Sequence, residues 1–233
     1  MPRYTTVYGE FVSRIDEVSL LRRKAAALER SSSSLHKGPE ISALCRAAVV
    51  LLSSHIEAYV KELGEHTLDS AHQKAVHRSK LAPQFFYYVS RERIENIRTS
   101  GQPETIANHV KALIDSDLMH WQGDGAIHGP IASQEFNAGF SNPKFDKVKS
   151  YFGRFGYTDF RKDFMRVLQH RGTLIEASLN TIVDTRNSIA HGDPAATNTP
   201  AEVKEMESVA KEFCRTVDLV FARWCKSALC SIR

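Results

Sequence analysis

The feature that most constrains the fold is the spacing of apolar residues. In the segments 7–30, 41–67 and 201–231, apolar side chains recur every three or four residues, which is typical of α-helices that bury one face. Sustained alternation with a period of two is almost absent, and no internal repeat is visible. Shorter helices are predicted at 91–99, 103–117, 142–152, 157–170 and 174–191. The sequence therefore predicts an all-α helical bundle.

The segment 41–67 is the most apolar of these, and we expect it to form the central core helix. Pro39 is suited to the first turn of that helix, because its fixed φ matches the helix and its missing N–H has no partner there anyway. The aromatic run 85–88 is predicted as a short apolar turn or a brief strand, since periodicity does not separate the two.

Residues 119–142 interrupt the helical pattern with four glycines and a proline. We expect a long irregular loop there, inserted into a single domain 1–233 whose core extends from about 41 to 231. Loops of this length are uncommon inside a domain and often functional. Trp121, Phe136 and Phe140 in this loop could stack on unpaired RNA bases or attach the loop to the core.

The composition favours a cytoplasmic protein without a membrane partner. No window approaches the roughly eighteen apolar residues of a transmembrane span, and the first residues lack the apolar core of a secretion signal. The four cysteines show neither disulfide-framework density nor C-x-x-C spacing, and are expected to be reduced thiols. His66, His72 and His77 do not share a helix face, so no metal site and no cofactor are expected.

Positive charge is concentrated between 144 and 171. Eight basic and three acidic residues give this segment a charge of +5, which leaves −1 for the rest of the chain, whose total is +4. Such a bias is compatible with a phosphate-bearing partner. Within it Lys162, Arg166 and His170 are spaced four apart. They form either a track for RNA phosphates or an ordinary solvated helix face.

An arginine interrupts the apolar stripe of the helix predicted at 174–191. The stripe consists of Ile175, Leu179, Ile182 and Ile189. Arg186 takes the missing position, four residues after Ile182 and three before Ile189, so its guanidinium points towards packed surface. A buried charge is costly unless it is paired, hydrogen-bonded or functional.

Two further polar groups accompany Arg186 at the end of this helix. Gly192 is expected just beyond the helix end, which puts His191 in the last turn, where free carbonyls favour an imidazolium. Asn187 lies four residues earlier on the same face, and Arg186 lies roughly 7.5 Å from His191 along the axis. A cation, an amide and an imidazole can together hold a phosphate and move a proton.

A purely structural interpretation also fits these residues. Arg186 could form an ion pair with a core acid such as Glu57, while His191 only caps its helix. Glu57 stands on a nearly all-apolar helix, where a carboxylate needs a cation. It could equally be a solvated residue at the helix edge.

Three segments resemble a known superfamily. Residues 186–192 (RNSIAHG) resemble the Arg-x-x-x-x-His signature of HEPN domains. Residues 54–60 (SHIEAYV), and Asn142-Pro143 followed by 151–156 (YFGRFG), resemble HEPN-like nucleases of the RiboL-PSP-HEPN kind. The resemblance extends from about 41 to the last residue, while the first helix carries no motif and 119–142 has no counterpart.

The resemblance implies a metal-independent endoribonuclease that acts as a homodimer, with the two motifs facing each other in one composite site. Arg186 would then hold the scissile phosphate, His191 would transfer protons, and Asn187 would position the phosphate or orient His191, with Glu57 in support. The implied setting is a toxin or an anti-phage effector, restrained by an antitoxin or another regulatory protein.

Two other functions stay open, because a fold does not guarantee an activity. Many HEPN proteins are catalytically inactive and bind RNA, a nucleotide or a protein partner. A third interpretation is a structural subunit that dimerises within a larger complex.

Overall fold

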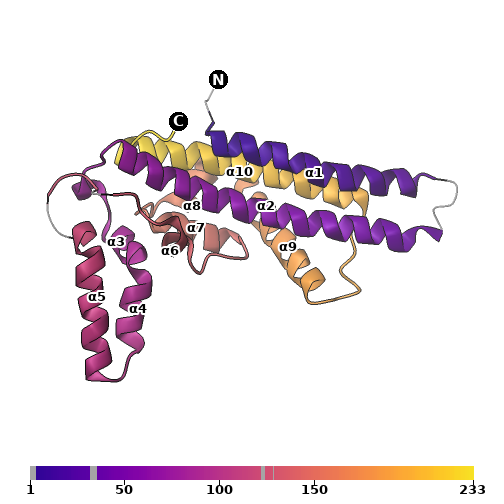
Figure 1. Cartoon of the computed structure of the whole chain (residues 1–233). Coiled ribbons are helices and arrows are strands. Elements are labelled where there is room, and N and C mark those ends of the chain that lie inside the picture. Colours follow the sequence, from indigo (N-terminus) through magenta and orange to yellow (C-terminus); the bar gives the residue numbers. More distant parts are fainter. Residues whose placement is uncertain (1–3, 32–35, 122–123, 128) are drawn as a thin grey trace.

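The computed structural model describes residues 4–31, 36–121, 124–127 and 129–233 (Figure 1). Three long helices lie side by side, namely α1 (Thr6–Glu29), α2 (Gly38–Gln73) and α10 (Pro200–Ala228) (Figure 1). Over the described residues there is no β-strand, and the only bridge pairs His77 with Ala126. The all-α bundle predicted from the apolar spacing is confirmed.

Helix α2 is the central element, as its sequence predicts. Helices α1, α10 and α9 (Gly172–Ala190) all pack on it, and Leu52, Ile56 and Leu63 are fully buried. By length and composition α2 is also apolar enough to cross a membrane, with one 18-residue window of mean hydropathy 1.4. Core helices meet the same criterion; 33% of this window is buried within the described structure, where α1, α9 and α10 pack on α2.

One glycine of α2 sets how closely the next layer approaches. A Cβ at Gly64 would overlap the ring of Tyr151, a fully buried residue of α7 (Phe145–Gly153). Beside it, α8 (Phe160–Leu168) completes an aromatic core with α7 and α10. The rings of Phe152 and Phe221, for example, lie 4.3 Å apart. Helices α7 and α8 of this layer both contact α9.

Residues 119–142 contain more structure than predicted. Helix α5 (Pro103–Trp121) extends into the segment, and α6 (Ser133–Asn137) lies within it. Phe136 and Phe140 are buried, so these two rings attach the segment to the core and are not free to stack on bases. Trp121 is 46% exposed, and its indole N–H donates to the Ser90 hydroxyl at 2.8 Å.

A buried arginine also holds this segment. The Arg154 guanidinium donates to the carbonyls of Phe136 and Ala138. It also lies over the rings of Tyr88 and Tyr151, 4.5 and 5.0 Å from their centroids. Cation–π contacts of this kind stabilise a charge that has left water.

The aromatic run 85–88 belongs to a short helix, α3 (Pro83–Val89), so both predicted alternatives are wrong. Pro83 starts the helix, and Phe85 and Val89, one turn apart, are buried. After it, α4 (Arg91–Thr99) and α5 form a hairpin that projects from the bundle (Figure 1). Asp117 is the only residue of the hairpin in the buried class.

Candidate active site

Helix α9 carries the Arg186 motif and leaves the bundle at its C-terminal end (Figure 1). The stripe residues Ile175, Leu179 and Ile182 are buried, and Ile189 is partly buried against the core. Arg186 lies on the same side of the helix and is half-buried. The apolar stripe therefore brings the guanidinium to the border between the core and solvent.

The end of α9 is set by its backbone. Gly192 has a φ of +80°, a conformation that glycine adopts without strain. Its N–H donates to the Ile189 carbonyl at 3.1 Å, and that of Asp193 to the Ser188 carbonyl at 3.0 Å. This pair of bonds is a Schellman motif, so the helix ends where its sequence predicts. His191 is the C-cap residue, and it is exposed.

Arg186 is held by two amides. Its Nη1 donates to the Asn142 Oδ1 at 3.3 Å and to the Asn187 Oδ1 at 3.0 Å. Within the described part of the chain, Arg186 forms no ion pair with a carboxylate. Neutral acceptors orient the guanidinium and leave its charge available to an anion.

The expected ion pair between Arg186 and Glu57 is wrong. One carboxylate oxygen of Glu57 pairs with the Lys61 ammonium at 2.7 Å, one turn further along α2. The other accepts the backbone N–H of Asn142 at 3.2 Å. Because a lysine four residues away already supplies the cation, Glu57 contacts the arginine only through Asn142.

Asn142 is a site residue whose role the sequence did not predict: Asn142-Pro143 stands out there only as part of the family resemblance and as the start of a helix. Its φ of +53° is left-handed, a conformation in which Asn is enriched among non-glycine residues. Next to it, the Phe145 N–H donates to the Asn180 Oδ1 at 3.0 Å, and Lys144 pairs with Asp184 at 2.6 Å. Residues 142–145, here called the strap, thus join α2 to α9.

A second arginine holds the chain that follows His191. Arg46 of α2 donates from Nη1 to the carbonyls of Asp193 and Ala196, at 2.8 and 3.2 Å. Bonds to backbone carbonyls have no sequence signature, which is why this residue was not found. Helix α2 therefore holds two segments next to the motif: Glu57 binds the strap, and Arg46 binds the chain that follows His191.

The predicted basic stripe is interrupted. Helix α8 ends at Leu168, and Gln169 has a φ of +51°, so His170 lies in the 3-10 turn η3 (Gln169–Arg171), off the helix face. Arg166 is paired with Asp163 at 2.9 Å. His170 precedes α9 and His191 follows it, so this 19-residue helix separates the two by roughly 28 Å.

Most of the positive charge between 144 and 171 is neutralised locally. Five of the eight basic residues form ion pairs, namely Lys144, Lys149, Arg161, Arg166 and Arg171. Arg154 is buried. Lys147 and Lys162 are exposed and form no ion pair within the described residues. The net charge of this segment therefore overstates the positive surface that it offers.

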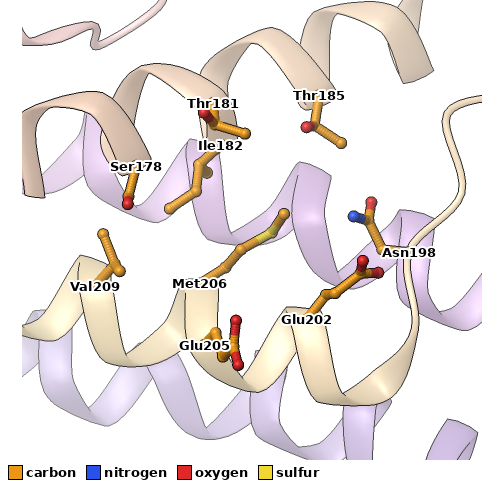
Figure 2. A pocket seen from close by; sticks show the side chains of 9 residues that line it. All are labelled: Ser178, Thr181, Ile182, Thr185, Asn198, Glu202, Glu205, Met206 and Val209. Atoms are coloured by element: carbon orange, nitrogen blue, oxygen red, sulfur yellow. The ribbon is translucent and has the colours of Figure 1, made fainter. Parts of the chain in front are cut away.

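A groove of about 290 Å³ lies between α9 and α10. Figure 2 shows the hydroxyls of Thr181 and Thr185 on one side and the carboxylates of Glu202 and Glu205 on the other. Its lining contains neither Arg186 nor any basic residue. A groove with two acids and no cation is unsuited to a phosphate.

In the described segments, no group of three or more His, Cys, Asp or Glu side chains is placed to hold a metal ion. All four cysteines are free. Burial raises the pKa of the Cys214 thiol well above its usual range, which disfavours the reactive thiolate.

The family model for RiboL-PSP-HEPN matches residues 10–223. The chain belongs to the RiboL-PSP-HEPN family. Neither the curated proteins nor the solved structures contain a match to this chain. The matched region of this HEPN protein includes α2, the strap and the whole of α9. Membership in the family points to a nuclease or another RNA-related role.

Proposed function

We propose that this HEPN protein is a metal-independent endoribonuclease whose site combines Arg186, Asn187 and His191. The observation that carries the proposal is the state of Arg186: a permanent cation, half-buried, held by two amide oxygens and not by an acid. A guanidinium in that state is suited to a phosphate, which it can bind with two parallel hydrogen bonds.

In the proposed reaction the RNA 2′-oxygen attacks the adjacent phosphorus, and the 5′-oxygen of the next nucleotide leaves. The products are a 2′,3′-cyclic phosphate and a 5′-hydroxyl. His191 takes the proton from the 2′-hydroxyl, since an imidazole can act as a base near neutral pH. Arg186 stabilises the negative charge that builds up on the phosphorane. Because the Asn187 Oδ1 faces Arg186, its amide N–H groups can donate to a phosphate oxygen.

The reaction also needs an acid to protonate the leaving oxygen, and a homodimer supplies it. One protomer has a single motif histidine, and a two-fold axis brings a second copy of it to the same site. The exposed position of His191 supports this arrangement, because a partner subunit can reach it.

Lys162, Arg166 and His170 are proposed as secondary contacts for long RNA. Because α9 is roughly 28 Å long, an RNA must extend well beyond the nucleotides bound at Arg186 to reach both ends of the helix. As a biological setting we propose a cytoplasmic toxin or anti-phage effector under the control of an antitoxin or regulatory protein, on the basis of the family resemblance.

The proposal is tested by incubating the purified protein with mixed RNA in EDTA, beside the Arg186→Ala and His191→Ala variants. We expect cleavage by the unaltered protein, and losses of about a hundredfold or more in both variants. Arg23→Ala and His36→Ala, two exposed positions on other elements, are matched controls that should cleave normally. Equal cleavage by all five proteins would refute the assignment.

A second candidate function is a binding module without catalysis. It is favoured by one observation, namely that both side chains that accept hydrogen bonds from Arg186 in the described structure are amides, which do not transfer protons. This function predicts that RNA raises the melting temperature while no cleavage occurs at any RNA concentration.

A further inference from the structure

We infer that Asn142 is a positioning residue of the Arg186 site. Its side chain orients the guanidinium towards the bound anion without neutralising the positive charge of Arg186. This inference deepens the proposed function and rests on it. Asn142 acts through Arg186, so it is distinct from the residues that touch the RNA.

The first argument is the way the donors of the guanidinium are used. An arginine has five N–H donors in a planar fork, two of them on Nη1. The amide oxygens of Asn142 and Asn187 both accept from Nη1. Arg186 has no other hydrogen-bond or ion-pair partner among the described residues, so the edge formed by Nε and Nη2 remains open. That edge is the one that can bind a phosphate with two parallel bonds.

The second argument is the chemical nature of the acceptor. A carboxylate in place of the Asn142 amide would form a charge-assisted bond with Arg186 and neutralise it. It would also bring a negative charge next to an incoming phosphate. An amide offers the same planar oxygen without either effect.

The third argument is how firmly Asn142 is fixed. Its own N–H donates to Glu57 of α2 at 3.2 Å, and Lys61 neutralises that carboxylate. On the other side of the strap, Phe145 and Lys144 bind side chains of α9. The Asn142 oxygen is therefore held in position relative to both helices, and it transmits that position to Arg186.

The inference is tested with two substitutions that both tolerate the left-handed backbone of residue 142. Asn142→Asp keeps the shape of the side chain and adds a charge, whereas Asn142→Gly removes the acceptor and adds none. The measurements are the melting temperature, the cleavage kinetics, and the affinity for a 2′-O-methylated RNA, which lacks the attacking hydroxyl. Asn108→Asp, on an exposed face of α5, is the matched control for an added negative charge.

We expect Asn142→Asp to fold with an equal or higher melting temperature and to bind the methylated RNA about tenfold or more weakly. Asn142→Gly should retain most of the affinity, because Arg186 keeps its charge. It should lose about tenfold in kcat, because the guanidinium is no longer held in its orientation. Asn108→Asp should behave like the unaltered protein.

Normal RNA affinity in a folded Asn142→Asp variant would overturn the inference, and so would a normal kcat in Asn142→Gly. The two proposals can fail separately. If the unaltered protein binds RNA and does not cleave it, the ribonuclease proposal fails, while the affinity of Asn142→Asp still decides the role of Asn142.

Discussion

Arg154 and Arg186 are two arginines drawn out of bulk water, and neither pairs with a carboxylate in the part of the chain that the structure describes. Arg154 is buried, binds backbone carbonyls and makes cation–π contacts with two tyrosine rings. Arg186 is half-buried and binds two side-chain amides at one edge. The comparison teaches that a buried arginine is not in itself a sign of function. A structural and a functional arginine differ in whether the N–H donors that the protein leaves unused face the interior or a possible ligand.

The electrostatics of the two sites differ accordingly. Burial lowers the pKa of the Arg154 guanidinium, because leaving water penalises its charged form, and the neighbouring Tyr88 and Tyr151 partly offset this effect. The hydrogen-bond acceptors of Arg154 are backbone carbonyls of the fold, and its Nε is buried without a partner among the described residues. Arg186 is only half-buried, so part of its side chain is accessible to solvent.

The largest effect expected from this comparison is on activity. Arg186→Leu restores the apolar stripe between Ile182 and Ile189, so the free energy of unfolding should stay within about 1 kcal/mol or rise. Cleavage should fall by about 10² to 10³, as for the loss of one group that stabilises charge in the transition state. Urea unfolding measures the free energy of unfolding, and initial cleavage rates measure the activity. A strongly destabilised Arg186→Leu protein would mean that this arginine, too, is structural.

The reverse outcome is expected at the other arginine. Arg154→Leu leaves the carbonyls of Phe136 and Ala138 without a donor and removes the contacts with both rings, so urea unfolding should show a loss of about 2–4 kcal/mol. Arg98→Leu is the matched control, because Arg98 is 73% exposed and should change stability by less than about 0.5 kcal/mol. Equal stability of the two variants would contradict a structural role for Arg154.

The smallest effect is expected on α8, where Arg161 pairs with Glu176 in the N-terminal part of α9. Lys162→Ala should weaken the binding of an RNA of about 20 nucleotides by about twofold to fivefold, since an exposed phosphate contact contributes little. Binding of a trinucleotide, which is too short to reach from His191, should be unchanged. Fluorescence polarisation at fixed salt measures both affinities. An equal loss for the two RNAs would place Lys162 at the same site as Arg186.

The sequence predicted the parts of the fold that depend on one helix at a time. Apolar spacing located α1, α2 and α10, and Gly192 located the end of α9, because these signals are local. It did not predict α3 or α6. These helices have only seven and five residues, too few for a clear period, and are stabilised by the aromatic residues that they bury.

The site was predictable to the same extent. Arg186, Asn187 and His191 stand within one turn and a half of one helix, so their proximity follows from the sequence. Asn142 reaches Arg186 through its side-chain amide oxygen, and Arg46 donates to a backbone carbonyl beyond His191. Both residues lie far from the motif in sequence, so these contacts leave no spacing pattern. The partner of Glu57 was mispredicted because Lys61, on the same helix face, was not considered as a competitor.

The projecting hairpin of α4 and α5 has a consequence for the dynamics of the molecule. Separating this hairpin from the bundle exposes little buried surface, because Asp117 is the only buried residue of α4 and α5. Backbone amides in α4 and α5 should therefore exchange with deuterium through local opening, at free energies well below that of global unfolding. Protease digestion under native conditions should cut there first and leave the three long helices intact.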